Sequence, residues 1–147
     1  KENKKIEVIP VKSSNLNKLH IDYFGTFKKY FIKTQQFSSV ITKEIFVKEI
    51  APARTFGFLD DLPLMKQNRL GMGTTLGNTV VIGQNEVFND MRFEDEFVRH
   101  KVLDLIGDLY LLGKPLIASV RAYQTGHSIN RLIIKDFIEN KNNWEVI

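Results

Sequence analysis

One segment of the sequence, DEFVRHKVLDLIGDLYLL at residues 95–112, has the period of an amphipathic helix. Its apolar side chains recur every three or four residues and cover one broad face: Val98, Val102, Leu105, Ile106, Leu109 and Leu112. Gly113 and Pro115 follow in the order that is typical of a helix end. Because such a stripe must be buried, we predict that this helix packs on a β-sheet.

The rest of the chain supplies that sheet. Alternating apolar residues predict strands at residues 6–11, 18–24, 35–41 and 115–123, and the run TVVIG at 79–83 predicts a strand with a hairpin partner. Further helices are expected at 43–51, capped by Thr42, at 60–69, capped by Asp60 or Asp61, and at 128–141, capped by Ser128. This order favours the α/β (α+β) class, as a two-layer sandwich of a mixed β-sheet packed on α-helices.

Length and composition limit the remaining possibilities. A chain of 147 residues suits a single domain, 1–147, and no apolar run reaches the roughly 18 residues that a membrane span needs. We therefore expect a soluble protein without stable membrane insertion. Cysteine is absent, so any metal ligands must come from Asp, Glu or the three histidines, His20, His100 and His127. The net charge of +4 comes from scattered residues, so we do not expect a nucleic-acid partner.

The predicted helix 95–112 carries an unusual polar row opposite its apolar face. His100, Asp104 and Asp108 recur at four-residue intervals, with Lys101 beside the first. The row is either a solvated helix face or a pair of ligands, His100 and Asp104, aimed at one cation such as zinc. Gly107 weakens an otherwise strong helix, which suggests that another backbone approaches there.

A second candidate lies in the stretch YQTGHSIN at residues 123–130. His127 follows a glycine at the expected start of a helix, which is an exposed position with little packing value. Such a histidine is either simply solvated or functional. Asp108 is a carboxylate that could orient it.

Three stretches carry a resemblance to a known family. ARTFGF (53–58), MRFEDEFVRHKVLDLIGDLYLLG (91–113) and AYQTGHSIN (122–130) resemble, in this order and spacing, the second domain of the UDP-3-O-acyl-N-acetylglucosamine deacetylases. These enzymes are zinc amidases that commit precursors to lipid A in Gram-negative bacteria. The resemblance extends over nearly the whole chain, to NNWEVI at the C-terminal end.

The resemblance implies a role for each matching residue. His100 and Asp104 match two of three protein zinc ligands, His127 matches the general-acid histidine, and Asp108 its carboxylate partner. Lys101 matches a lysine beside the metal that also meets the substrate, and Thr55 a hydroxyl that faces the reacting carbonyl. The matches on the substrate side are Phe56, Phe58 and Gly126. The glycine-rich segment matches a small βαβ insert, at about residues 70–90, whose apolar passage holds an acyl chain.

Two departures from the family pattern concern substrate binding. Gln124 stands where the family has a basic residue that can meet phosphate, and Gly73, Thr74 and Thr75 replace a usual GGS sequence. The third zinc ligand, a histidine, and a glutamate general base belong to a first domain that this chain lacks. KENKK at residues 1–5 is expected to be a linker to it, and His20, in a predicted strand, is expected to lie on a sheet face.

The chemistry expected of such a site is zinc-dependent hydrolysis of an N-acetyl group. A zinc ion with an open coordination position lowers the pKa of bound water to about 7, while Fe²⁺ would suit the same ligands. We expect the enzyme to act in the cytoplasm, and this half alone to be inactive. The alternative is a non-catalytic module that binds a nucleotide sugar or an acyl group, although it would not need four such polar residues.

Overall fold

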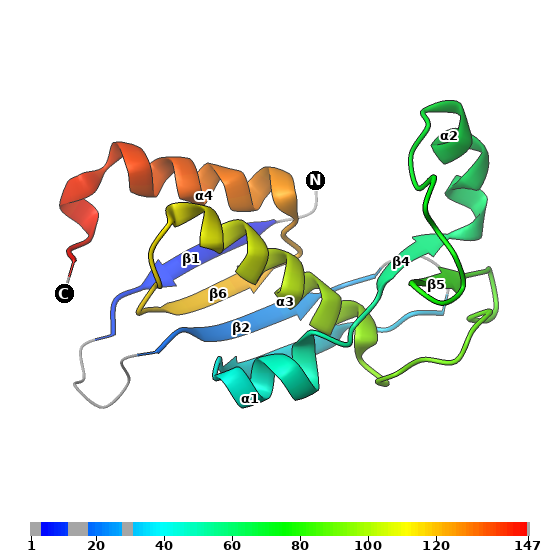
Figure 1. Ribbon diagram of the computed structural model, residues 1–147, viewed down its shortest axis with the longest axis horizontal. Coiled ribbons are helices and arrows are strands. Elements are labelled where there is room, and N and C mark those ends of the chain that lie inside the picture. The colour runs from blue at the N-terminus through cyan, green and yellow to red at the C-terminus, as the bar shows by residue number, and fades with distance from the viewer. Residues whose placement is uncertain (1–3, 12–17, 28–30, 147) are drawn as a thin grey trace.

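The computed structural model describes residues 4–11, 18–27 and 31–146, so most of the expected linker lies outside the described residues. Its main sheet has the strand order β1-β6-β2-β3 (Figure 1). The strands are β1 (Lys5–Ile9), β2 (His20–Gly25), β3 (Gln35–Val40) and β6 (Ser119–Tyr123). β6 pairs parallel with β2, whereas the β1–β6 and β2–β3 pairs are antiparallel. The sheet is therefore mixed, as predicted.

The two faces of this sheet differ in burial, following the alternation in the sequence. Ile21 and Tyr23 of β2 and Val120 and Ala122 of β6 are buried on one face. Their neighbours Asp22, Arg121 and Tyr123 lie on the opposite face, which remains open to solvent. The prediction of a sheet with one solvated face is confirmed.

Helices cover the buried face and complete the two-layer α+β sandwich (Figure 1). α3 (Glu96–Leu109) contacts β2 and β3, and a 3₁₀ turn at Tyr110–Leu112 ends it at Gly113, whose φ is 71°. α4 (His127–Glu139) contacts β1 and α3, and a 3₁₀ turn (Lys141–Asn143) follows it. α1 (Lys43–Ile45) continues as a π-helical turn (Phe46–Ile50), and Thr42 Oγ1 caps it by accepting from the Ile45 N–H (3.1 Å).

The core forms where the apolar face of α3 meets the sheet. Val98, Val102 and Leu105 have no exposed surface and pack against Ile21 and Val120. Burying each such side chain contributes about 1.5–3 kcal/mol. This contact fixes the rotation of α3 and so decides which of its polar residues face α4.

A smaller unit stands beside the sandwich (Figure 1). β4 (Thr55–Phe58) pairs parallel with β5 (Thr79–Ile82), and the segment between them holds a 3₁₀ turn (Leu59–Asp61) and α2 (Leu62–Gln67). Asp61 occupies the N-cap position of α2. The unit is a βαβ arrangement that begins at Thr55, and the glycine-rich segment forms only its second half.

Four local expectations differ from the structure. α4 begins at His127 with Gly126 in the cap position, so Ser128 is not the cap. Among the described residues no backbone approaches Gly107: the residue is exposed, and a Cβ built there would meet nothing within 4 Å. The hairpin expected after β5 is a single bridge between Ile82 and Val87. The strand expected from residue 115 begins only at Ser119, because the preceding residues have no ladder partner in the described part.

Among the described residues, no helix combines the length and the apolar character that a membrane span requires.

Candidate active site

The polar row of α3 meets the start of α4 in one cluster. His100 and Asp104 lie one turn apart on α3, with 3.4 Å between His100 Nε2 and Asp104 Oδ1. His127 Nε2 lies 3.9 Å from the same Asp104 oxygen, and His127 Nδ1 lies 2.8 Å from Asp108 Oδ2. We call these four residues the histidine–carboxylate cluster. The structure thus brings together four of the residues that the sequence singled out on these two helices.

The turn before α4 places His127. Gln124 adopts a left-handed conformation (φ 50°), and its N–H donates to the Phe24 carbonyl of β2 (2.8 Å). The Tyr23 hydroxyl then donates to the Thr125 carbonyl (2.7 Å). Two hydrogen bonds therefore anchor the turn to β2 and hold the backbone from which the His127 imidazole projects. The side chain of His127 is nevertheless 56% exposed.

Burial of the Tyr23 side chain raises its pKa to about 12, with a further contribution from the negative charge of Asp104. The hydrogen bonds with Thr125 act in the opposite direction but do not offset burial. Tyr23 is therefore a neutral hydrogen-bond donor at every physiological pH.

Asp108 is the most buried member of the histidine–carboxylate cluster, at 9% exposure. Its Oδ2 accepts from His127 Nδ1 and from Asn130 Nδ2, both at 2.8 Å. Asn130 is fully buried on α4, and its own Oδ1 has no hydrogen-bond partner among the described residues. Sequence reasoning missed Asn130, although its position three residues after His127 puts both on one face of α4.

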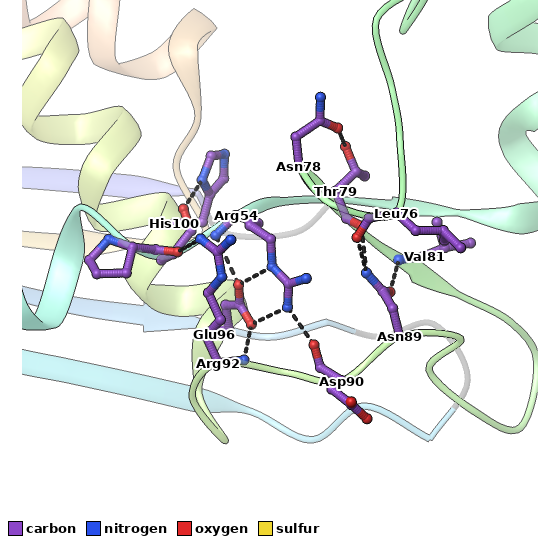
Figure 2. Close-up of polar contacts among 12 residues, drawn as sticks. Arg54, Leu76, Asn78, Thr79, Val81, Asn89, Asp90, Arg92, Glu96 and His100 are labelled. Atoms are coloured by element: carbon purple, nitrogen blue, oxygen red, sulfur yellow. Dashed lines mark hydrogen bonds and ion pairs between the residues drawn. The ribbon is translucent and has the colours of Figure 1, made fainter.

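The other nitrogen of His100 faces the backbone of the segment before β4. His100 Nδ1 lies 3.2 Å from the Ala53 carbonyl oxygen. A dashed line from the labelled His100 marks this contact in Figure 2. The next residue, Arg54, forms a buried ion pair with Glu96 of α3, with Nε and Oε1 2.9 Å apart. Neither Arg54 nor Glu96 was expected to contribute, and only the acidic residue in the first turn of α3 could have drawn attention to the pair.

The Arg54–Glu96 pair is ionised in spite of its burial. Burial by itself raises the pKa of Glu96, but hydrogen bonds from the Arg54 side chain and from the Arg54 and Arg92 backbones outweigh it and hold that pKa below its ordinary value. The hydrogen bonds with Glu96 raise the pKa of Arg54. Both charges are therefore retained inside the fold.

An aromatic group borders the cluster on the side of the βαβ unit. The Phe56 ring lies 6.4 Å from the His100 ring and 5.7 Å from the Lys101 ammonium, and it packs edge-on against Phe97. Lys101 Nζ donates to Asp104 Oδ2 (2.8 Å), which leaves Asp104 Oδ1 toward the two histidines. The lysine thus pairs with a member of the cluster rather than extending into solvent.

Thr55 and Phe56 also line a pocket of about 190 Å³ inside the βαβ unit. It is mostly apolar, and its other walls come from β4, α2, the glycine-rich segment and β5: Gly57, Phe58, Leu62, Met65, Gly71, Thr74, Thr79 and Val81. Thr55 itself is exposed at the start of β4. Since Phe56 touches both the pocket and His100, the apolar pocket and the polar cluster adjoin.

Two further residues from the sequence analysis, Gly126 and His20, lie outside the histidine–carboxylate cluster. A Cβ built on Gly126 would meet nothing within 4 Å, so open space adjoins the turn before His127. His20 lies away from the cluster on the solvent side of the sheet, with Nδ1 3.2 Å from Ser119 Oγ. A larger hollow of about 470 Å³ opens on that same face, beside Phe24, Arg121 and Tyr123, and contains no member of the cluster.

Two atoms of the cluster have the spacing of neighbouring ligand atoms on a metal ion. A tetrahedral zinc ion with ligands at about 2.0–2.1 Å places neighbouring ligand atoms about 3.4 Å apart, which is the His100 Nε2 to Asp104 Oδ1 distance. These two side chains therefore fit adjacent positions on one ion. In the part of the chain that the structure describes, no group of three or more His, Cys, Asp or Glu residues could hold a metal by itself.

The geometry defines a class of protein, an α+β sandwich with a histidine–carboxylate cluster beside an apolar pocket. Residues 1–139 match the LpxC family, described as UDP-3-O-acyl N-acetylglycosamine deacetylase, and the chain belongs to that family. Proteins of Psychrobacter cryohalolentis and Psychrobacter arcticus, both named UDP-3-O-acyl-N-acetylglucosamine deacetylase, are each 37% identical to it over 149 residues. The matches cover 99% of this chain but 45% of each relative, so the chain spans less than half their length.

Proposed function

We propose that this chain is the C-terminal half of a zinc-dependent deacetylase that removes the N-acetyl group of UDP-3-O-acyl-N-acetylglucosamine in lipid A biosynthesis in the cytoplasm. The observation that carries the proposal is the 3.4 Å between His100 Nε2 and Asp104 Oδ1, beside a second histidine already paired with a carboxylate. Family membership and the deacetylase names of both relatives support it.

In this proposal His100 and Asp104 are two of the three protein ligands of zinc, or of Fe²⁺. The third ligand, a histidine, and a glutamate general base come from the N-terminal domain, which is the partner of this half. When bound, the ion supplies a Lewis acid and a water of lowered pKa. Lys101 holds Asp104 Oδ2, so that Oδ1 stays directed at the ion.

His127 is the general acid in this scheme. Asp108 holds its Nδ1, so Nε2 points toward Asp104 and toward the space where the scissile amide would lie. In its doubly protonated form, His127 can stabilise the negative charge that develops on the amide oxygen and then donate its Nε2 proton to the leaving amine. The Thr55 hydroxyl adds a second donor toward the same oxygen.

The substrate side is formed by the βαβ unit. The pocket of about 190 Å³ would take the acyl chain, with Phe56 and Phe58 as apolar walls next to the reacting centre. The open space at Gly126 would admit the sugar. Gln124 is uncharged, so contact with the nucleotide would depart from the family pattern there. Thr74 lies at the pocket wall, so acyl selectivity would depart from the pattern at that position.

A zinc titration tests the ligand assignment. We would titrate zinc into the protein and into His100→Ala in competition with a chelating dye. His20→Ala is the matched control, because it removes the same side chain from the solvent side of the sheet. With two of three ligands present, binding should be weak, lost in His100→Ala and unchanged in His20→Ala. Binding that persists in His100→Ala contradicts the proposal; its loss justifies assaying deacetylation after the N-terminal domain is added.

A further inference from the structure

The peptide group between Ala53 and Arg54 lies between two residues of α3. Its N–H, which belongs to Arg54, donates to Glu96 Oε1 (2.9 Å), and its carbonyl, which belongs to Ala53, lies 3.2 Å from His100 Nδ1. Glu96 and His100 are one helical turn apart. Figure 2 shows both contacts, so one face of α3 holds both ends of one peptide group.

This peptide group has little freedom to rotate. Arg54 Nε and Nη2 bind the two Glu96 oxygens at 2.9 and 3.1 Å, and Nη2 also donates to the Asp90 carbonyl. On the other side, Arg92 donates from its backbone N–H to Glu96 Oε2 (2.7 Å) and from Nη1 to the Pro52 carbonyl (2.6 Å). Glu96 has no exposed surface and accepts from four donors. The carboxylate therefore organises the segment 52–54.

The contact with His100 depends on where the imidazole proton lies. A carbonyl oxygen can only accept, so Nδ1 must carry a proton for this contact to be a hydrogen bond. In the neutral ring Nε2 is then left with its lone pair, and Nε2 is the nitrogen that faces Asp104. A carboxylate on the N–H of the peptide group also polarises its carbonyl and makes it a better acceptor for His100.

We propose that Glu96 is a positioning residue that acts through the Ala53–Arg54 peptide group to hold His100 as the Nδ1–H tautomer, with Nε2 free to bind a metal ion. Histidine ligands commonly donate their second N–H to a backbone carbonyl, and such partners tune metal affinity. The proposed use of Nε2 rests on the proposed function, but the tautomer itself does not and is measured without any metal.

The test is the tautomer of His100 in the intact protein, labelled with ¹⁵N-histidine and freed of metal by a chelator at pH 8. Two-bond ¹H–¹⁵N spectra distinguish Nδ1–H from Nε2–H, and the His100 signal is the one missing in His100→Gln. Glu96→Gln removes the charge at nearly constant size. Glu94→Gln is the matched control, because it makes the same change at an exposed position two residues earlier.

In the wild type and Glu94→Gln we expect the Nδ1–H tautomer. In Glu96→Gln the ratio of Nδ1–H to Nε2–H should fall about fivefold, as expected from weakening one hydrogen bond. Arg54→Lys tests whether the effect passes through the peptide group or comes only from a looser structure around Glu96. It removes guanidinium contacts but keeps the backbone N–H to Glu96 hydrogen bond of residue 54, so the tautomer should be retained.

Three results would overturn the inference: Nε2–H in the wild type, no change in Glu96→Gln, or an equal change in Arg54→Lys. If Glu96→Gln does not fold, Glu96→Asp takes its place, since its carboxylate is one methylene too short for the same bond. Zinc titration of the same samples gives an independent readout, with affinity about tenfold lower in Glu96→Gln. A correct tautomer without zinc binding would refute the proposed function alone, and a wrong tautomer with zinc binding would refute only the role of Glu96.

Discussion

Replacing Tyr23 by Phe tests how the turn before His127 is held. Tyr23 is 1% exposed, and its hydroxyl donates to the carbonyl of Thr125, a residue that is also buried. Tyr23→Phe keeps the ring and removes that donor, so a buried carbonyl loses its partner. This costs about 1–3 kcal/mol of the free energy of unfolding at neutral pH.

The same hydroxyl makes stability depend on alkaline pH. The Tyr23 pKa is about 12 in the folded protein, because burial disfavours the phenolate, against an ordinary value of 10.0. The unfolded chain therefore releases this proton first as the pH rises. The contribution of Tyr23 to the free energy of unfolding is fully present below pH 10 and is lost between pH 10 and 12. The difference of two pKa units corresponds to about 2–3 kcal/mol.

The assay is urea unfolding of the wild type, Tyr23→Phe and Tyr110→Phe at several pH values from 8 to 12. Tyr110 is 82% exposed, so its variant should follow the wild type throughout. The advantage of the wild type over Tyr23→Phe should shrink by about 2–3 kcal/mol across this range and so vanish or reverse. If the free energies of unfolding of these two proteins, plotted against pH, stay parallel up to pH 12, the account of Tyr23 is refuted.

Three further predictions concern the scaffold. Gly107→Ala should raise the free energy of unfolding by up to about 1 kcal/mol, because a Cβ there meets nothing in an exposed part of α3; a thermal melt that shifts downward contradicts this. Asn89→Ala removes hydrogen bonds with the Val81 N–H and the Thr79 and Leu76 carbonyls (Figure 2) and should speed hydrogen exchange in β5 but not in α3. Because the Glu96 pKa is held below 4.5, the wild type should lose stability as the pH falls below that value, whereas Glu96→Gln should show a flatter acid titration.

The sequence predicted the sandwich well where the signals are periodic. The stripe on α3 gave its position to within a few residues, because Val98, Val102 and Leu105 repeat at the helical period and Gly113 adopts the left-handed conformation that ends it. The alternation in β2 and β6 likewise gave the buried face of the sheet. In each case the information lies within a few neighbouring residues.

The parts that could not be predicted depend on contacts distant in sequence. An acidic residue in the first turn of a helix usually faces solvent, and the burial of Glu96 depends on Arg54, 42 positions away. Ser128 satisfied the local rule for a cap, yet the turn anchored by Tyr23 starts α4 one residue before it. The four-residue strand β4 gives too short a pattern, and it forms because β5 pairs with it.

The order of strands in the main sheet has a consequence for folding during synthesis on the ribosome. β6 lies between β1 and β2, yet it is made about a hundred residues after either of them. Until residues 119–123 emerge, β1 has no neighbour in the main sheet and β2 has only β3. The nascent chain must therefore keep β1 unpaired in the main sheet while the residues between β1 and β6 are made, and insertion of β6 completes the sheet and brings His127 to Asp108 in one late event.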